Sequence, residues 1–223
     1  MPHFRVISHE IRAQNIRERP GAVKASHERE LRLAVKQYVP HGNPFAGDGD
    51  STIIGAQANG FPKVELYEPL WDDIHQRLLG QNRRIRSIWI ADVVQQGQSA
   101  VLNEEILGDD PSWFDHGRDL LFLINQLQDH ITQPMFGVGH SMDGMQLRVH
   151  WPSRAEAAKK FHSSAFYQAL DWRVLDKWVT YGLRDLPTKL YPTSRDTGAE
   201  EPTVTLTTPK SFRIDRCSPE IYT

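Results

Sequence analysis

The chain has 223 residues, of which 39% are hydrophobic and 24% charged, as in an ordinary globular protein with one core. Its formal net charge of -2 gives no reason to expect a nucleic-acid partner or an anionic membrane surface. The one cysteine, Cys217, excludes a disulfide within the chain, which fits a reducing intracellular compartment. No apolar stretch is long enough to cross a bilayer.

Four segments have the pattern of strands. Residues 31–39 alternate apolar and polar side chains, which is the period of a half-buried strand. Residues 52–56, 85–92 and 135–138 are short apolar runs, as expected of strands buried on both faces.

Two segments between these strands have helical spacing. Residues 65–79 place Leu66, Leu70, Ile74 and Leu78 on one face, and residues 115–130 form a second amphipathic stretch that includes Leu121. Strands that alternate with helices predict an α/β fold with a mostly parallel sheet and helices on both faces. We therefore expect a site at the carboxyl ends of the strands.

The pattern changes after Gly144. Residues 153–181 read as aromatic-rich helices, with Ser153 as the predicted N-cap and Glu156 three residues later. No strand-like run follows until residues 204–206. We therefore expect a partial α/β core over residues 1–150, a helical lid over 151–190 and a partly irregular tail over 191–223.

The motif Gly139-His140-Ser141-Met142 lies between a predicted strand and a predicted helix. This is the context of a nucleophile elbow, in which a serine on a tight turn presents its hydroxyl above the sheet. The G-x-S-x-G pattern is broken, because Asp143 stands where the last glycine belongs. An ordinary strand-to-helix turn with a serine N-cap explains the motif equally well.

Two further loops follow predicted strands. In α/β-hydrolases the loop at the position of residues 57–61 supplies one oxyanion-hole N–H, and the residue after the serine supplies the other. These groups would be the backbone N–H groups of Phe61 and Met142. Residues 92–99 (D-V-V-Q-Q-G-Q-S) have the Asp-to-Gly-x-Ser form that is common in this fold. Either loop is also an ordinary turn of a βα unit.

Several longer sequence motifs resemble those of a fungal family of α/β-hydrolases of secondary metabolism. They are N-G-F-P-K at 59–63, E-L-Y-E-P-L-W-D at 65–72, I-W-I-A-D at 88–92, D-P-S-W-F-D-H at 110–116 and G-H-S-M at 139–142. The resemblance covers most of residues 4–147 and resumes at residue 151. The family includes the peroxisomal acyl-CoA hydrolase of mycophenolic acid synthesis and hydrolases of Alternaria host-selective toxin clusters.

The resemblance implies a Ser-Asp-His triad with Ser141 as the nucleophile, an ester or acyl-CoA thioester substrate, and no cofactor. It also implies a peroxisomal location, although the C-terminal Ile221-Tyr222-Thr223 is not a Ser-Lys-Leu type address. Phe166, Tyr167 and Trp178 of the expected lid suit an apolar acyl pocket. Helices that merely pack on the sheet are an equally good explanation of these aromatic residues.

The departures from the family concern the triad. The family has glycine where Asp143 stands and histidine where Gln57 stands, and Val64 is an extra residue. A piece that carries the triad Asp is missing between Leu147 and Trp151, and the part with the triad His is missing too. The fold is thus truncated relative to the family, and we expect an exposed sheet edge and aggregation.

The order of residues along the chain also indicates, without the family, that the triad is incomplete. The chain order of this fold is Ser, then Asp or Glu, then His, and only His150 and His162 follow Ser141. His150 is too close to reach back, and His162 lies in a helix-like segment. The upstream His116 and His140 are expected to pack near a helix start and to face away. No pair of residues has metal-ligand spacing.

Two functions remain open. One is a serine thioesterase or esterase that acts on a small acyl substrate in a fungal toxin pathway. The other is a non-catalytic α/β-hydrolase remnant, with a binding or scaffold role or none. The sequence does not indicate the oligomeric state.

Overall fold

The computed structural model describes the sheet, its helices and most of the segment after residue 150. The described residues are 1–24, 29–42, 50–58, 63–112, 114–139, 150–189, 191 and 203–208, without the side chains of residues 150, 165 and 166.

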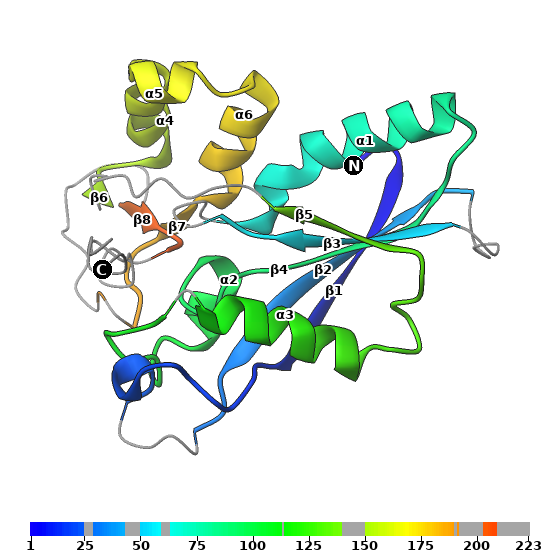
Figure 1. Ribbon diagram of the computed structural model, residues 1–223. Coiled ribbons are helices and arrows are strands. Elements are labelled where there is room, and N and C mark those ends of the chain that lie inside the picture. The colour runs from blue at the N-terminus through cyan, green and yellow to red at the C-terminus, as the bar shows by residue number, and fades with distance from the viewer. Residues whose placement is uncertain are drawn as a thin grey trace, which may run out of the picture.

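The main sheet has five strands in the order β1-β2-β4-β3-β5 (Figure 1). Its strands are β1 (Phe4–Arg12), β2 (Arg32–Pro40), β3 (Ser51–Ala56), β4 (Ile85–Ala91) and β5 (Met135–Gly139). Because β2 is antiparallel to both of its neighbours and the other pairs are parallel, four of the five strands run in one direction. The prediction of an α/β fold with a mostly parallel sheet is confirmed.

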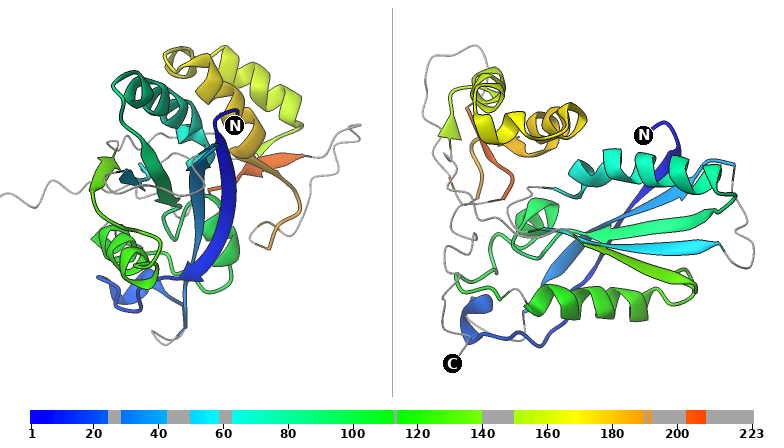
Figure 2. Two further views of the ribbon diagram at one scale, coloured as in Figure 1. Left: turned by 90° about the vertical axis from the view of Figure 1, so that its right-hand side faces the viewer. Right: turned by 45° about the horizontal axis from the view of Figure 1, so that its top comes forward.

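Helices cover both faces of this sheet, as Figure 2 shows. The short η2 (Val64–Tyr67) leads into α1 (Glu68–Gly80) on one face, where Trp71 packs on Ile88 and Ile90. On the other face, α3 (Phe114–Gln126) packs Leu123 against the sheet. Two short helices, η1 (Pro20–Ala22) and α2 (Gly97–Leu102), complete this part.

Three local expectations differ from the structure. Strand β1 was not predicted, because it is an edge strand in which charged and apolar residues are mixed, with much of it exposed. Leu70 and Leu121 are 41% and 60% exposed, so the apolar faces of α1 and α3 are narrower than their spacing indicates. The first turn of the predicted helix at 65–79 is the separate η2, whose Leu66 packs with the segment after residue 150.

The chain after residue 150 forms a small unit that we call the cap. Its helices are α4 (Arg154–His162), α5 (Ala165–Gln168) and α6 (Trp172–Tyr181), as the aromatic-rich pattern predicts. Its strands β6 (His150–Trp151), β8 (Val204–Leu206) and β7 (Leu183–Asp185) form a separate antiparallel sheet in that order. The Ser153 side chain accepts a hydrogen bond from the Glu156 N–H, which confirms the predicted N-cap.

The cap lies beyond the carboxyl ends of β3 and β5, beside the start of α1 (Figure 1). Lys177 of α6 donates to the buried carboxylate of Glu68, and Arg173 forms a bidentate pair with Asp73 at 3.0 Å. These contacts join α6 to α1, so the position of the cap relative to the sheet is set by side chains of both parts.

Candidate functional site

Three parallel strands of the sheet, β3, β4 and β5, end at the same level, in one row of paired residues. Ala56 of β3 is paired with Ala91 of β4 on one side and with Gly139 of β5 on the other. The next residues are therefore Gln57, Asp92 and the start of the segment that contains Ser141. Since β4 and β5 lie on opposite sides of β3, this row is a topological switch point, where open α/β sheets bind their ligands.

The loop after β3 is tied down at both ends. At its start, the Gln57 side chain accepts the Val93 N–H at 2.7 Å, and the Ala58 N–H donates to the Tyr67 hydroxyl at 2.7 Å. At its end, the Val64 N–H donates to the Asp92 carboxylate at 3.2 Å. Burial raises the pKa of Tyr67 to about 12, so this hydroxyl stays neutral and acts as a fixed acceptor.

The buried carboxylate of Asp92 holds two loops at the carboxyl ends of β3 and β4. Its buried carboxylate accepts the Val64 N–H with one oxygen and the Gln98 N–H, at 2.7 Å, with the other. Burial, and next the charge of Glu65, raise the pKa of Asp92 to about 7, against the opposing effect of these two hydrogen bonds. The side chain therefore joins the loop after β3 to the start of α2.

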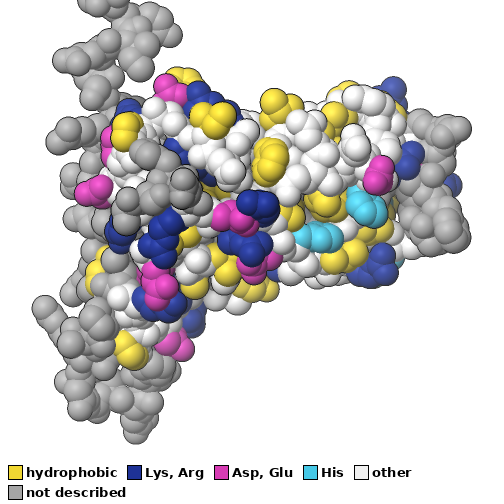
Figure 3. Space-filling model, turned by 90° about the horizontal axis from the view of Figure 1, so that it is seen from below, with side chains coloured by type: hydrophobic (Ala, Val, Ile, Leu, Met, Phe, Trp, Pro, Cys, Tyr) yellow, Lys and Arg dark blue, Asp and Glu magenta, His cyan; other side chains and the backbone are white. Residues whose placement is uncertain are grey.

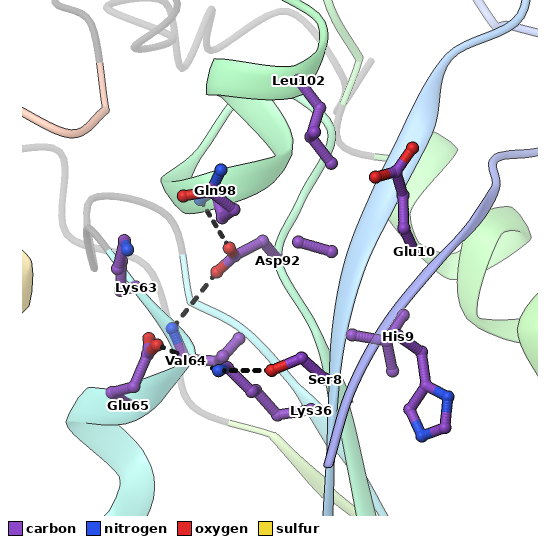
Figure 4. Close-up of a pocket in the computed structure, with 12 residues that line it drawn as sticks. Ser8, His9, Glu10, Lys36, Lys63, Val64, Glu65, Asp92, Gln98 and Leu102 are labelled. Carbon is purple, nitrogen blue, oxygen red and sulfur yellow. Dashed lines mark hydrogen bonds and ion pairs between the residues drawn. The ribbon is translucent and has the colours of Figure 1, made fainter.

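A cavity of about 390 Å³ lies beside Asp92 (Figure 4). Lys36 from β2 donates to Ser8 at 2.9 Å and lies 3.7 Å from Glu65, and the wall contains both cationic and acidic side chains. Because β1 and β2 form much of this wall, the cavity lies on the β2 side of β4, whereas β5 lies on the other side. It is not the place where the segment after β5 leaves the sheet.

His116 lies in the first turn of α3. This turn is at the carboxyl-end side of the sheet, because α3 leads back to the start of β5 (Figure 1). The side chain is buried, and neither ring nitrogen has a hydrogen-bond partner among the described residues. Burial lowers the pKa of His116 to about 4, so the imidazole is neutral at physiological pH.

The two histidines that follow Ser141 in the chain lie in the cap. His150 is in β6, paired with Thr205, and His162 is exposed at the end of α4. Neither follows a strand of the main sheet, so neither has the location of a triad base in this fold. His140 lies outside the described residues.

The predicted nucleophile and oxyanion groups are not among the described residues. Ser141, Met142 and Asp143 lie in the segment 140–149, and Phe61 lies in 59–62. What the structure gives is their immediate neighbours, Gly139 and Ala58, at the ends of adjacent strands. The sequence thus places the predicted groups on two loops that leave the sheet side by side.

Two of the three predicted acyl-pocket residues lie inside the cap core. Tyr167 and Trp178 are buried and meet edge to face at 5.3 Å, and Tyr167 also contacts Phe161 at 4.7 Å. Phe166 lies in α5, and its side chain is outside the described part. The buried pair packs within the core of the cap rather than on the main sheet.

Sequence reasoning missed the roles of Tyr67 and Gln57 in holding the loop after β3. Gln57 was noted only as a departure from the family. The positions of Gln57 and Asp92 could have identified them from the sequence, since both are polar residues directly after predicted buried strands. Tyr67 gave no signal of this kind, because the hydrogen bond from Ala58 depends on how η2 folds back.

The described residues carry neither a metal cluster nor a membrane-crossing helix. No group of three or more His, Cys, Asp or Glu residues in the described part could hold a metal ion. Within the same residues, no helix is long and apolar enough to span a bilayer. On the face shown in Figure 3, acidic and basic side chains are mixed with hydrophobic ones.

The chain is similar to fungal thioesterases. It is 35% and 34% identical, over 263 residues, to the type I acyl-CoA thioesterases mpaH′ and mpaH of Penicillium brevicompactum. It is 35% identical over 264 residues to mpaH of Penicillium roqueforti. Each alignment covers 95% of this chain but 59% of the relative, so the chain spans about three fifths of the relatives' length. No protein-family model matches the chain.

The alignment is longer than the chain itself. Because 263 exceeds 223 by 40, at least 40 residues of the first relative have no counterpart here. This agrees with the expectation that a piece of the family's chain is missing here.

A solved structure has the same fold. The peroxisomal α/β-hydrolase Lpx1 of Saccharomyces cerevisiae superposes with a TM-score of 0.70 over 96% of this chain and 67% of its own, at 14% identity. Together with the switch point, the loops at the carboxyl ends and the helices on both faces, this likeness identifies the chain as a protein with the α/β-hydrolase fold.

Proposed function

We propose that this chain is a serine-hydrolase-type protein of fungal toxin or polyketide biosynthesis that receives an acyl-CoA thioester or an ester. Ser141 would be the nucleophile, and the N–H groups of Met142 and Phe61 would form the oxyanion hole. The observation that carries the proposal is the register of Ala56 with Gly139, which starts the two relevant loops on one row of the sheet. The similarity to acyl-CoA thioesterases supports the substrate class.

In such a site, the serine hydroxyl attacks the acyl carbonyl and a base removes its proton. The two N–H groups would stabilise the negative charge that develops on the carbonyl oxygen. The anchors at Gln57, Tyr67 and Asp92 would hold the loop after β3 in place, so that its N–H does not have to reorganise during the reaction. An intracellular, peroxisomal location belongs to the same proposal.

The second candidate is a non-catalytic acyl-binding or scaffold protein. It is favoured by the histidines, because His150 and His162 lie in the cap and His116 has a depressed pKa and no described partner. A serine without a positioned base is a poor nucleophile, and loss of triad members removes up to about a million-fold in kcat. We therefore expect this chain to hydrolyse esters and thioesters at trace level only.

The test compares wild type with Ser141→Ala. Both are incubated with a fluorophosphonate probe, and hydrolysis of a medium-chain acyl-CoA and a short-chain p-nitrophenyl ester is measured. Labelling and turnover of wild type clearly above Ser141→Ala would establish the hydrolase. Equal background rates, with acyl-CoA binding detected by calorimetry, would establish the non-catalytic candidate. No binding and no turnover would refute both.

A further inference from the structure

The cavity beside Asp92 is a second candidate site, next to the proposed hydrolytic one (Figure 4). Leu33 and Val35 of β2 pack in the core cluster that includes α3, so the alternation of a strand turns Ala34 and Lys36 to the opposite face, where η2 and α1 lie. Residues of β1, β2, η2 and α2 enclose the space. Its volume of about 390 Å³ is within the usual range for small-molecule sites.

Charges of both signs line this cavity. In Figure 4, Lys63 and Glu65 are on one side, Glu10 is on the other, and Lys36 and Asp92 lie between them. Because burial raises the pKa of Asp92 to about 7, this carboxyl is partly protonated at neutral pH, and the two lysines balance the other two carboxylates. The carboxylates would repel a phosphate group, and an alkyl chain would leave the charged groups without partners. The cavity therefore favours a neutral ligand that carries hydrogen-bond donors and acceptors.

The Glu65 carboxylate lacks a hydrogen-bond donor. This residue is 8% exposed, and its Oε2 atom has no hydrogen-bond partner among the described residues. The Lys36 ammonium lies 3.7 Å from the other oxygen, which is beyond hydrogen-bond distance. Buried carboxylates normally accept hydrogen bonds, so a ligand with an N–H group would satisfy this one. The Lys63 ammonium and the Gln98 amide line the same cavity and can donate to a carbonyl oxygen.

An acyl-CoA has one part with these properties. Its acyl chain is apolar and its nucleotide carries phosphates, whereas the pantetheine arm between them is neutral and has amide groups and a hydroxyl. We propose that the cavity beside Asp92 binds the pantetheine arm of an acyl-CoA, with an amide N–H of the arm donating to Glu65 and an amide carbonyl accepting from Lys63. The assignment rests on the proposed function for the identity of the substrate.

The arm is long enough to join the two sites. Asp92 directly follows β4, which is two strand spacings, about 10 Å, from β5. The arm has about as many bonds in its chain as four residues of a polypeptide and so spans about 14 Å when extended. A thioester at Ser141, two residues after β5, could therefore extend its arm across the loop after β3. The hydrogen bond from Val64 to Asp92 fixes the end of that loop at the edge of the cavity.

The first experiment blocks the cavity from the edge strand. Ser8→Trp places a large side chain at an exposed position of the cavity wall. Val6→Trp is the matched control, because Val6 is 37% exposed on the same face of β1 and does not line the cavity. Both are made in a Ser141→Ala background, and binding of S-methylpantetheine is measured by ligand-observed NMR. We expect the parent and the control to bind it, and Ser8→Trp to bind it at least about ten-fold more weakly.

The second experiment asks which part of the substrate and which side chain are involved. 3′,5′-ADP carries phosphates of CoA without the arm, and octanoate is an acyl chain without the arm, so neither should displace S-methylpantetheine. Glu65→Gln should weaken binding of S-methylpantetheine, because a carboxylate accepts an N–H more strongly than an amide does. Glu105→Gln, at an exposed carboxylate outside the cavity, is the control and should not.

The outcomes separate the cavity from the proposed function. No binding of S-methylpantetheine, or equal binding to Ser8→Trp and Val6→Trp, would overturn the assignment of the cavity. Equal binding of octanoyl-CoA to the parent and Ser8→Trp would exclude the cavity but leave an acyl-CoA site in place. Binding of the arm that Ser8→Trp abolishes would support the cavity even if wild type hydrolyses nothing, because every protein in the comparison lacks Ser141.

Discussion

The α-carbon of Gly97 lies directly against the carboxylate of Asp92. A Cβ atom at Gly97 would come within 2.5 Å of the carboxyl carbon and both oxygens, and Gly97 has a φ of +56°. Glycine is therefore required here on two grounds, the contact and the left-handed backbone. This contact lets the Gln98 N–H reach Asp92, so that one buried side chain holds two loops of the candidate site.

Replacing Gly97 with alanine should destabilise the protein. We expect a loss of about 1–3 kcal/mol in the free energy of unfolding, since the carboxylate must move and the backbone is strained. Gly117→Ala in α3 is the control, because nothing lies within 4 Å of its added Cβ, and it should stabilise by about 0.5–1 kcal/mol. Denaturant unfolding measures both, and equal effects at the two glycines would contradict the proposed contact.

Asp92 should make stability depend on pH. Its pKa is about 7 in the folded protein and about 4 when unfolded, so the folded state binds the proton more tightly. Its contribution is fully present below pH 4 and is lost as the pH rises from about 4 to about 7. Unfolding curves should therefore show wild type losing stability relative to Asp92→Asn across this range. A constant difference between the two proteins would mean that Asp92 stays ionised throughout.

His116 should have the opposite pH dependence. Its pKa of about 4 lies below the ordinary value of 6.5, so the unfolded chain binds the proton more tightly. The contribution of His116 is present above about pH 6.5 and is lost as the pH falls toward 4. His116→Leu should remove this loss. Near neutral pH it should leave stability unchanged or raise it by about 1 kcal/mol, because it removes two buried ring nitrogens that have no hydrogen-bond partner among the described residues. Destabilisation at neutral pH would reveal a hydrogen-bond partner of His116.

Lys177 should matter more than Arg173 in holding the cap. Among the described residues, Lys177→Ala leaves the buried Glu68 carboxylate with the Tyr38 hydroxyl, at 3.3 Å, as its one side-chain partner, and we expect a loss of about 2–4 kcal/mol. Arg173→Ala breaks an ion pair with the exposed Asp73 and should cost less than about 1 kcal/mol. Comparable losses in denaturant unfolding would show that Glu68 does not depend on Lys177.

Restoring a glycine at position 143 should not restore turnover. Asp143→Gly supplies the small residue that the elbow requires and removes a negative charge two residues from Ser141. The hydrolysis rate should still stay within about ten-fold of Ser141→Ala, because no base is supplied. A rate far above that of Ser141→Ala, measured with a medium-chain acyl-CoA, would reveal a base elsewhere in the chain.

The sequence by itself determined the local elements. Short apolar runs predicted β3, β4 and β5, helical spacing predicted α1 and α3, and Ser153 with Glu156 predicted the start of α4. These features depend on side-chain periodicity and on contacts within about four residues, which a sequence states directly. Edge strand β1 was not predicted, because its mixture of charged and apolar residues weakens the period-2 alternation of a strand.

The tertiary structure alone decided which side chains meet. The contacts of Asp92 with Val64, of Gln57 with Val93 and of Lys177 with Glu68 join residues 28, 36 and 109 positions apart. The exposure of Leu121 and Phe136 was also decided by the tertiary structure, because burial of a side chain depends on which other elements cover it. Apolar spacing shows that a helix or strand has an apolar face, but only the arrangement of the whole chain determines whether anything packs against it.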